Sequence, residues 1–448
     1  MADIPKGADL VGVAPEQAPD LTAAPEIVAE VPPEVVAQTL GQYARGYLAR
    51  IRAGESGVLP VIVAMVVIVI VFSVLSPVYL SAGNLVNLFQ QSAVIMVLAM
   101  AECFALVLGE IDLSVGFVGA CGAAITVQLI QPATTNWSWP LAIIAGLAFC
   151  LVFGGIQGLF ITRLRLPSFI VTLAGYLVCN GLFLFILLLG PFSGYPNLIG
   201  QSDNLHLIYN LMWANIDPTV SWIGAGVVVL VLGLLIWLAD SRRRKSGLVA
   251  PPASLSAIKI GVIAGVAIVV VAICNINRGV LIVQEGVPWV IPIVLAVLGV
   301  WTVLLGRTRY GRYVYAIGGN PEAARRAGIN LSLIRTTGFM LCSFTAGIGM
   351  LLYASYLNGM SNNVQGGQYV LYAVAAAVIG GTSLMGGRGK PLHGVLGGLV
   401  IGSIYNGMFL LQLHFEWQYI VTGLVLLAAI IIDAVSRRGS SSGSVTRI

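Results

Sequence analysis

Four polar side chains stand inside long apolar stretches of the sequence, where each could bind a polar solute or join two helices. They are Glu102, Gln157, Asn180 and Asn406. A carboxylate within a bilayer costs about 3 kcal/mol on insertion scales, so an acid at that depth is a candidate functional group. Glu102 could line a pathway or carry a proton, or it could be protonated and hydrogen-bonded to a neighbouring helix. The three amides join helices more often than they bind a ligand.

Two further carboxylates, Glu110 and Asp112, lie beside Ser114 in the motif Gly109-Glu-Ile-Asp-Leu-Ser-Val-Gly116. Asp112 or Ser114 can accept hydrogen bonds from the free N–H groups of the helix that follows, and negative charge suits that helix end. Capping alone would explain much of this motif. The alternatives are a contact with a cytoplasmic partner and a place on the exit route of a solute.

The segment 310–329 contains a short, complete helix. Asn320 is a good N-cap, Pro321 fits the first helical position, and Gly328 ends the helix. Its alanines form a small surface that could dock into a groove of a partner, whereas the alternative is a plain surface connector. The candidate contact residues are Gly318, Gly319, Asn320, Pro321, Glu322, Ala323, Ala324, Ala327 and Gly328.

A third, glycine-rich motif runs from Gly380 to Lys390. A Walker A loop needs a Gly six residues before its final Lys and a Ser or Thr after that Lys. Leu384 and Pro391 occupy these positions, and no other stretch of the sequence has the pattern. We expect a tight turn that another backbone approaches closely. Its candidate residues are Gly380, Gly381, Thr382, Ser383, Gly386, Gly387 and Arg388.

The sequence predicts no metal site and no cofactor on this chain. The histidines, His206, His393 and His414, lack any metal-ligand spacing, and the six cysteines fall in apolar segments without a CxxC pair. Such cysteines are expected to be buried thiols. Nucleic acid is not expected as a partner, because the basic residues form short clusters beside apolar segments instead of one patch.

The elements that must position these groups are membrane-spanning helices. Hydrophobic residues make up 58% of the sequence and charged residues 9%, whereas soluble domains have about 25% charged residues. The fold class is therefore predicted as an all-α integral membrane protein. A span needs about 20 apolar residues. Twelve transmembrane helices are predicted, at 58–76, 91–109, 114–131, 140–161, 168–190, 219–239, 259–276, 288–305, 332–357, 369–382, 392–413 and 417–435.

The placement of basic residues supports that number and the orientation. With the N-terminus inside, every Lys and Arg except Arg278 falls in an inside loop or terminus. This is what the positive-inside rule requires, and an error of one helix would disrupt the alternation in every later loop. Both termini are therefore predicted to be cytoplasmic.

Three regions follow along the chain. Residues 1–56 are rich in Ala, Pro, Glu and Val and are predicted to be a disordered cytoplasmic extension. Residues 57–436 form the transmembrane domain, which includes the inside loop 306–331, and residues 437–448 are a cytoplasmic tail.

Short matches between the two halves indicate an inverted repeat. Gly158-Leu-Phe160 resembles Gly407-Met-Phe409, and Phe169-Ile-Val-Thr172 resembles Tyr419-Ile-Val-Thr422. Inverted repeats are typical of transporters, although apolar segments also match by chance.

The three motifs together resemble those of the membrane permeases of ATP-binding-cassette (ABC) carbohydrate importers, in the ribose/xylose branch. That family shows Gly-Gly-Ile-Asp-Leu-Ser-Val-Gly, matched at 109–116 with Glu110 replacing the second Gly. It shows Gly-Arg…Ala-Ile-Gly-Gly-Asn…Ala-Ala…Gly-Ile, matched at 311–329, and Gly-Gly-Thr-Ser-Leu…Gly-Gly-Arg-Gly, matched at 380–389. The resemblance covers about 57–435. Glu110 adds a charge at the membrane edge.

The resemblance implies import of a monosaccharide by alternating access across the bacterial inner membrane. A separate cytoplasmic ATPase, carrying ATP and Mg²⁺, would hold the helix at 320–328. A sugar-binding protein would dock on the outside loops, including 191–218, and a second permease copy or a sister permease would complete the path. Three helices over 219–305, where ribose-type permeases need one, resemble the xylose type and favour a pentose such as xylose.

The sequence leaves three other functions to compare with sugar import. A proton-coupled secondary transporter would use Glu102 and need no ATPase. An intramembrane enzyme would need clustered His, Asp or Ser in several spans, and the sequence has no such cluster. A receptor or scaffold would leave the repeat and the helix at 320–328 unexplained.

Overall fold

A computed structural model of the protein describes residues 41, 42, 45, 59–189, 196–200, 202–246, 251–279, 282–414, 416–425, 427, 428 and 431. The predicted extension 1–56, apart from three of its residues, and the predicted tail 437–448 lie outside the described residues.

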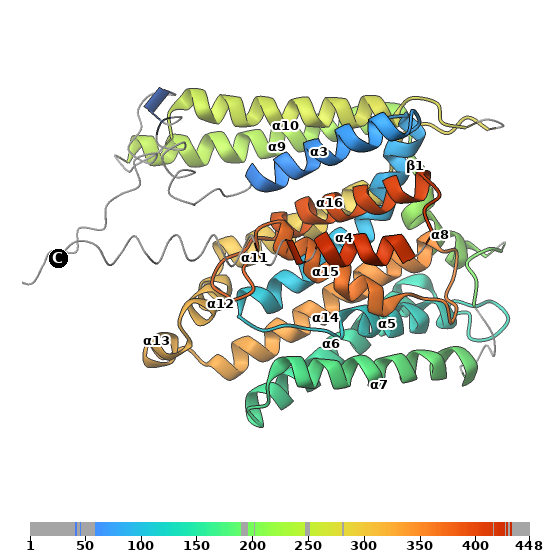
Figure 1. Cartoon of the computed structure of the whole chain (residues 1–448), viewed down its shortest axis with the longest axis vertical. Helices are drawn as coiled ribbons and strands as arrows, with labels where there is room; N and C mark the ends of the chain where they lie inside the picture. Colours follow the sequence, from blue (N-terminus) through green and yellow to red (C-terminus); the bar gives the residue numbers. More distant parts are fainter. Residues whose placement is uncertain are drawn as a thin grey trace, which may run out of the picture.

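The described chain is a bundle of helices with one two-residue strand pair (Figure 1). The first half comprises α3 (Leu59–Leu75), α4 (Ala82–Val107), α5 (Val115–Leu129), α6 (Trp139–Arg163), α7 (Ser168–Leu189), α8 (Asp203–Trp213), β1 (Asn215–Ile216) and α9 (Pro218–Lys245). The second comprises α10 (Ala253–Cys274), β2 (Val287–Pro288), α11 (Val290–Arg307), α12 (Arg309–Gly319), α13 (Pro321–Arg326), α14 (Leu331–Tyr356), α15 (Gly366–Ile379) and α16 (Pro391–Leu410).

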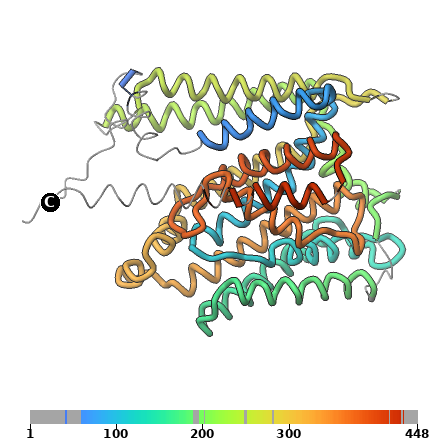
Figure 2. Tube along the Cα trace, in the orientation of Figure 1, coloured from blue at the N-terminus to red at the C-terminus, as the bar shows by residue number. Residues whose placement is uncertain are grey.

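Helix α4 forms the centre of the bundle. Helices α14, α15 and α16 pack against it, and every residue from Gln90 to Val107 is buried. Helices α9 and α10 pair at one edge with their apolar side chains largely exposed, and α7 lies at the opposite edge (Figure 2). Exposed leucine and valine on the outer helices and a buried centre are what a bilayer-embedded bundle requires.

Eight helices in the described ranges are long and apolar enough to cross a membrane: α4, α6, α7, α9, α10, α11, α14 and α16. Helices α3, α5 and α15 are apolar but shorter. All of these fall on predicted segments, and the helical residues 416–425 fall on the last one. The number of twelve spans, the inverted repeat and the cytoplasmic placement of both termini stay predictions.

Several elements differ from the sequence-based expectation. Helix α4 begins at Ala82, capped by the Ser81 hydroxyl, which accepts from Asn84 N at 3.3 Å. Helices α8 and α12 and the strand pair β1–β2 were not predicted. Because α8 and α12 are short or amphipathic, a search for long apolar runs passes over them.

Helix α16 approaches its neighbours through glycine. A methyl group on Gly402 would overlap the Ser92 hydroxyl of α4, and one on Gly397 would overlap the Ala376 carbonyl oxygen of α15. Small residues of this kind allow transmembrane backbones to approach closely. These glycines therefore allow α16 to pack closely against both α4 and α15. The three sequence motifs lie at the end of α4.

Candidate functional site

The three sequence motifs meet at the end of α4. The Gly387 N–H donates to the Val107 carbonyl oxygen at 2.8 Å. A methyl group on Gly318, near the end of α12, would overlap that same oxygen and lie 2.6 Å from Gly387 N. One on Gly386 would lie 2.7 Å from the Gly318 carbonyl oxygen and 2.9 Å from Gly109 N. We call Gly109, Gly318, Gly386 and Gly387 the glycine junction.

The glycine junction also depends on backbone conformation. Gly109, Gly386 and Gly387 have φ angles of 78°, 83° and 72°, in the left-handed region that favours glycine. Each of the three motifs therefore contributes glycine where a side chain would clash or strain the backbone. The expected close approach of another backbone to the third motif is present.

Polar contacts reinforce the glycine junction. The Tyr315 hydroxyl of α12 donates to the Gly389 carbonyl oxygen at 2.7 Å. The Ser383 N–H donates to the Arg388 carbonyl oxygen at 2.9 Å and closes the turn between α15 and α16. Glu110 pairs with Arg335 of α14 at 3.3 Å, which assigns a partner to the charge that departs from the family motif.

Helix α13 projects from the bundle beside α12 (Figure 1). Asn320 Oδ1 accepts from Ala323 N at 3.0 Å, Pro321 stands in the first turn, and Glu322 pairs with Arg325 at 2.8 Å. Gly328, with φ of 80°, follows the helix. The predicted cap, start and end of this helix are thus present in the structure.

The burial of Ala324 differs from the sequence-based expectation that the three alanines of this segment form an outward surface. Ala324 is only 4% exposed and belongs to the core cluster of the bundle, whereas Ala323 and Ala327 are exposed. Helix α13 therefore packs against the rest of the bundle through Ala324. Of the three alanines, Ala323 and Ala327 remain available to a partner.

A buried polar cluster lies at the start of α5. The Ser114 hydroxyl donates to Asp112 Oδ1 at 2.6 Å, the Ser114 N–H donates to the same atom at 2.9 Å, and Gln157 Nε2 donates to the Ser114 hydroxyl at 3.0 Å. Ser114 occupies the N-cap position of α5 without a side-chain cap bond. The predicted capping role is therefore replaced by bonds within the cluster.

Two carboxyl groups belong to this cluster. Glu102 and Asp112 are both fully buried, and no described side chain donates a hydrogen bond to the Glu102 carboxyl group. Burial raises the pKa of Asp112, although the Ser114 hydrogen bonds lower it. No group of three metal-ligating side chains occurs among the described residues.

Asn406 joins α16 to α4. Its Nδ2 donates to Asn84 Oδ1 at 3.0 Å and to Gln91 Oε1 at 3.2 Å. Asn180 on α7 is half-buried and makes no side-chain hydrogen bond within the described ranges. The four candidate pathway residues thus do not converge: Glu102 and Gln157 lie in the buried polar cluster, and the two asparagines lie elsewhere.

Asn406→Ala should lower the free energy of unfolding of the detergent-purified protein by about 1 kcal/mol, and with it the unfolding temperature. Interhelical hydrogen bonds in membrane proteins typically contribute free energies of that order. The substitution also leaves the Asn84 and Gln91 amides with one partner fewer. Asn180→Ala is the matched control and should change the unfolding temperature little. Equal unfolding temperatures for the two variants would show that the Asn84–Asn406–Gln91 link does not stabilise the bundle.

Sequence reasoning missed a cluster of tyrosines between α14, α15 and α16. Tyr353 and Tyr369 have ring centroids 4.5 Å apart, Tyr369 and Tyr372 5.8 Å, and Tyr372 and Tyr405 6.3 Å. The Gln91 amide borders the tyrosine cluster, and its Nε2 donates to the hydroxyl of Tyr356 at 3.2 Å. The three-residue spacing of tyrosines in the predicted spans at 332–357 and 369–382 was the available signal. Aromatic faces beside a few polar groups are typical of small-molecule sites.

Comparison with known proteins identifies the family. A family described as branched-chain amino acid transport system / permease component matches residues 84–430. The chain belongs to this permease family. It is 34% identical to the xylose transport system permease protein of Haemophilus influenzae, over 84% of this chain and 96% of that protein. No solved structure matches the chain.

Two further relatives are similar over most of the permease. The xylose transport system permease protein of Escherichia coli is 35% identical over 81% of this chain and 87% of its own length. The ribose import permease protein of Escherichia coli is 27% identical over 83% of this chain and 92% of its own length. With its apolar helices, the permease is a multi-pass protein of the bacterial inner membrane.

Proposed function

We propose that this chain is the permease subunit of an ABC importer for a monosaccharide, and that the sugar is a pentose such as xylose. The observation that carries the coupling to an ATPase is the exposed helix α13, which is capped at Asn320 and joined through α12 to the glycine junction. The relatives named for xylose and ribose support a sugar over an amino acid, although the family description names amino acids.

Two observations support xylose over other sugars as the transported substrate. The relatives named for xylose are 34% and 35% identical, whereas the relative named for ribose is 27% identical. The pair α9–α10 also supplies the added helices that resemble the xylose type. The cluster of Tyr353, Tyr356, Tyr369, Tyr372 and Tyr405 would offer ring faces and hydroxyls to a sugar.

The partners follow from this proposal. A cytoplasmic ATPase would hold ATP and Mg²⁺ and contact α13, and this chain would supply no catalytic residue. A sugar-binding protein would dock on the outer loops, which include α8, and a second copy of the permease would complete the path. Movement of α13 would reach α4, α15 and α16 through α12, because Gly318 touches both Val107 and the turn at Gly386–Gly387.

Uptake of labelled xylose by cells expressing the whole importer tests the sugar. We expect excess unlabelled xylose to abolish labelled uptake, ribose to compete more weakly, and leucine to have no effect. Competition by leucine as strong as that by xylose would contradict the sugar assignment, and stronger competition by ribose would contradict the choice of xylose.

The alternative is a proton-coupled transporter, which the fully buried Glu102 carboxyl favours. Glu102→Gln keeps the size of the side chain and removes its ability to ionise. Under our proposal, xylose uptake by this variant should stay within about twofold of the wild type, because the driving force comes from ATP. Loss of uptake, with Asn180→Gln active as a control, would favour the proton-coupled mechanism.

A further inference from the structure

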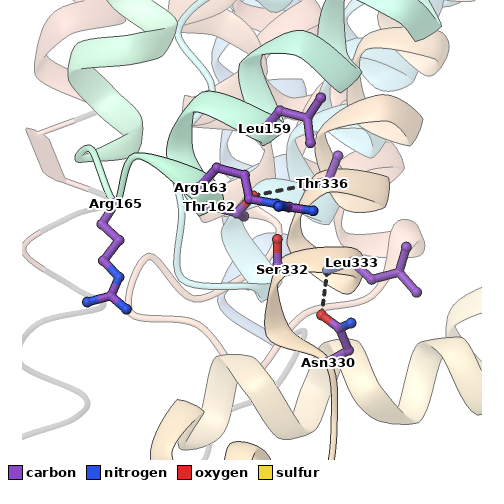
Figure 3. Close-up of a pocket in the computed structure, with 8 residues that line it drawn as sticks. All are labelled: Leu159, Thr162, Arg163, Arg165, Asn330, Ser332, Leu333 and Thr336. Carbon is purple, nitrogen blue, oxygen red and sulfur yellow. Dashed lines mark hydrogen bonds between the residues drawn. The ribbon is translucent and has the colours of Figure 1, made fainter.

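A pocket of about 540 Å³ opens between the end of α6 and the start of α14 (Figure 3). Arg163 and Arg165 line it from α6 and the loop after it, and Ser332 and Thr336 line it from α14. The pocket is separate from the glycine junction and from the tyrosine cluster. Neither of the proposed roles, ATPase coupling and sugar passage, uses its residues.

The pocket has an excess of positive charge. Arg163 and Arg165 are exposed, and neither has an ion pair or a hydrogen bond to any described residue. Arg335, nearby in the chain, is by contrast paired with Glu110. The Arg163 guanidinium lies beside the pocket hydroxyls, and Arg165 adds a second positive charge at the edge of the pocket (Figure 3). Guanidinium and hydroxyl groups are donors suited to a phosphate.

Uncharged donors complete this set. Asn330 Oδ1 accepts from Leu333 N at 3.0 Å, which leaves the Asn330 amino group as a donor. The Ser332 hydroxyl faces the same space as the Arg163 side chain (Figure 3). The first turn of α14 adds the positive end of a 26-residue helix.

Apolar side chains continue from the pocket onto the outer surface. Leu159 and Leu333 line it and are 47% and 58% exposed. Leu164 and Leu166, which alternate with the two arginines, are 62% and 43% exposed. A free phosphate or an acidic protein segment would leave this apolar rim uncovered, whereas the acyl chains of a lipid would cover it.

We propose that this pocket binds the phosphate headgroup of an anionic phospholipid, with its acyl chains against Leu159, Leu164 and Leu333. The arginines belong to a predicted inside loop, so the lipid would come from the cytoplasmic leaflet, where basic pockets between helices bind anionic headgroups. Since Asn330 caps α14 directly after α13, the bound lipid would hold the base of the helix that follows the ATPase contact.

Native mass spectrometry of the purified full-length permease, titrated with phosphatidylglycerol or phosphatidylcholine, tests this proposal. We expect phosphatidylglycerol to bind more tightly than phosphatidylcholine. Arg163→Gln with Arg165→Gln should weaken phosphatidylglycerol binding by roughly tenfold or more, given the contribution of each basic residue near an anionic headgroup. Arg242→Gln with Arg243→Gln removes the same charge from the exposed end of α9 and should change the binding less than about twofold.

A second variant separates the pocket from its charge. Ser332→Phe keeps both arginines but fills the space, and should weaken phosphatidylglycerol binding to a similar extent. Equal losses in the two arginine double variants, or equal binding of the two lipids to wild type, would overturn the proposal. Displacement of phosphatidylglycerol by excess inorganic phosphate would show that the pocket recognises the free anion, and would also overturn it. Because lipid binding is measured without transport, an error in the proposed sugar would not affect these results.

Discussion

Ala323→Glu together with Ala327→Glu is expected to abolish co-purification of the ATPase subunit and to reduce xylose uptake at least tenfold. Ala323 lies on α13 and Ala327 is its C-cap residue; both are exposed, and neither belongs to the core of the bundle. Two carboxylates forced into an interface centre would be desolvated without partners, and substitutions at such centres commonly cost 2 kcal/mol or more, which is about thirtyfold in affinity.

The choice of these two positions matters because Ala324 is buried. A glutamate at Ala324 would disturb the packing of α13 and could not separate lost docking from lost folding. Ala133→Glu, an exposed position in the loop after α5, is the matched control and should retain the ATPase. If the α13 variant also retains the ATPase and transports at the wild-type rate, α13 is not the coupling contact.

Gly318→Ala is expected to remove most transport activity and to lower the unfolding temperature, whereas Gly319→Ala is expected to do neither. The added methyl group at Gly318 would overlap the Val107 carbonyl oxygen and press on Gly387 N. Overpacking of this kind costs about 1–3 kcal/mol, and here it would separate α12 from the turn between α15 and α16. Apart from its chain neighbours and the backbone of its own helix, no described atom lies within 4 Å of the methyl group at Gly319.

This pair of variants is informative because Ala is otherwise the better helix former. Replacement of Gly by Ala within a helix stabilises it by up to about 1 kcal/mol, so helix propensity predicts the opposite sign for Gly318. Thermal unfolding and xylose uptake of both variants should be measured in the same preparation. Equal behaviour of the two would show that the glycine junction is not tightly packed and does not transmit movement from α13.

The apolar helices could be predicted from the sequence because a bilayer demands long apolar runs. The start of α4 could not, since it carries Asn84, Gln90 and Gln91, which the fold buries and bonds to other helices. A hydropathy profile scores amide side chains as polar and therefore predicts a loop at these positions. Only the tertiary structure shows that the amides have hydrogen-bond partners on other helices. Helix α12 was missed for a related reason, because its exposed face is polar.

The candidate site was predictable in its parts but not in its assembly. Local rules gave the cap at Asn320 and the glycine-rich turn, because both depend on neighbours in the chain. The contacts among Gly109, Gly318 and Gly386 join segments far apart in the sequence, and no local pattern specifies them. The burial of Ala324 and the grouping of the tyrosines depend in the same way on which helices pack together.

Reconstitution in liposomes tests the central claim most directly. The permease, its ATPase subunit and the sugar-binding protein would be incorporated with or without ATP on the ATPase side, and uptake of labelled xylose would be followed. We expect uptake only with ATP, with no inhibition by a proton uncoupler. Uptake without ATP that follows an imposed proton gradient and is abolished by the uncoupler would contradict the account.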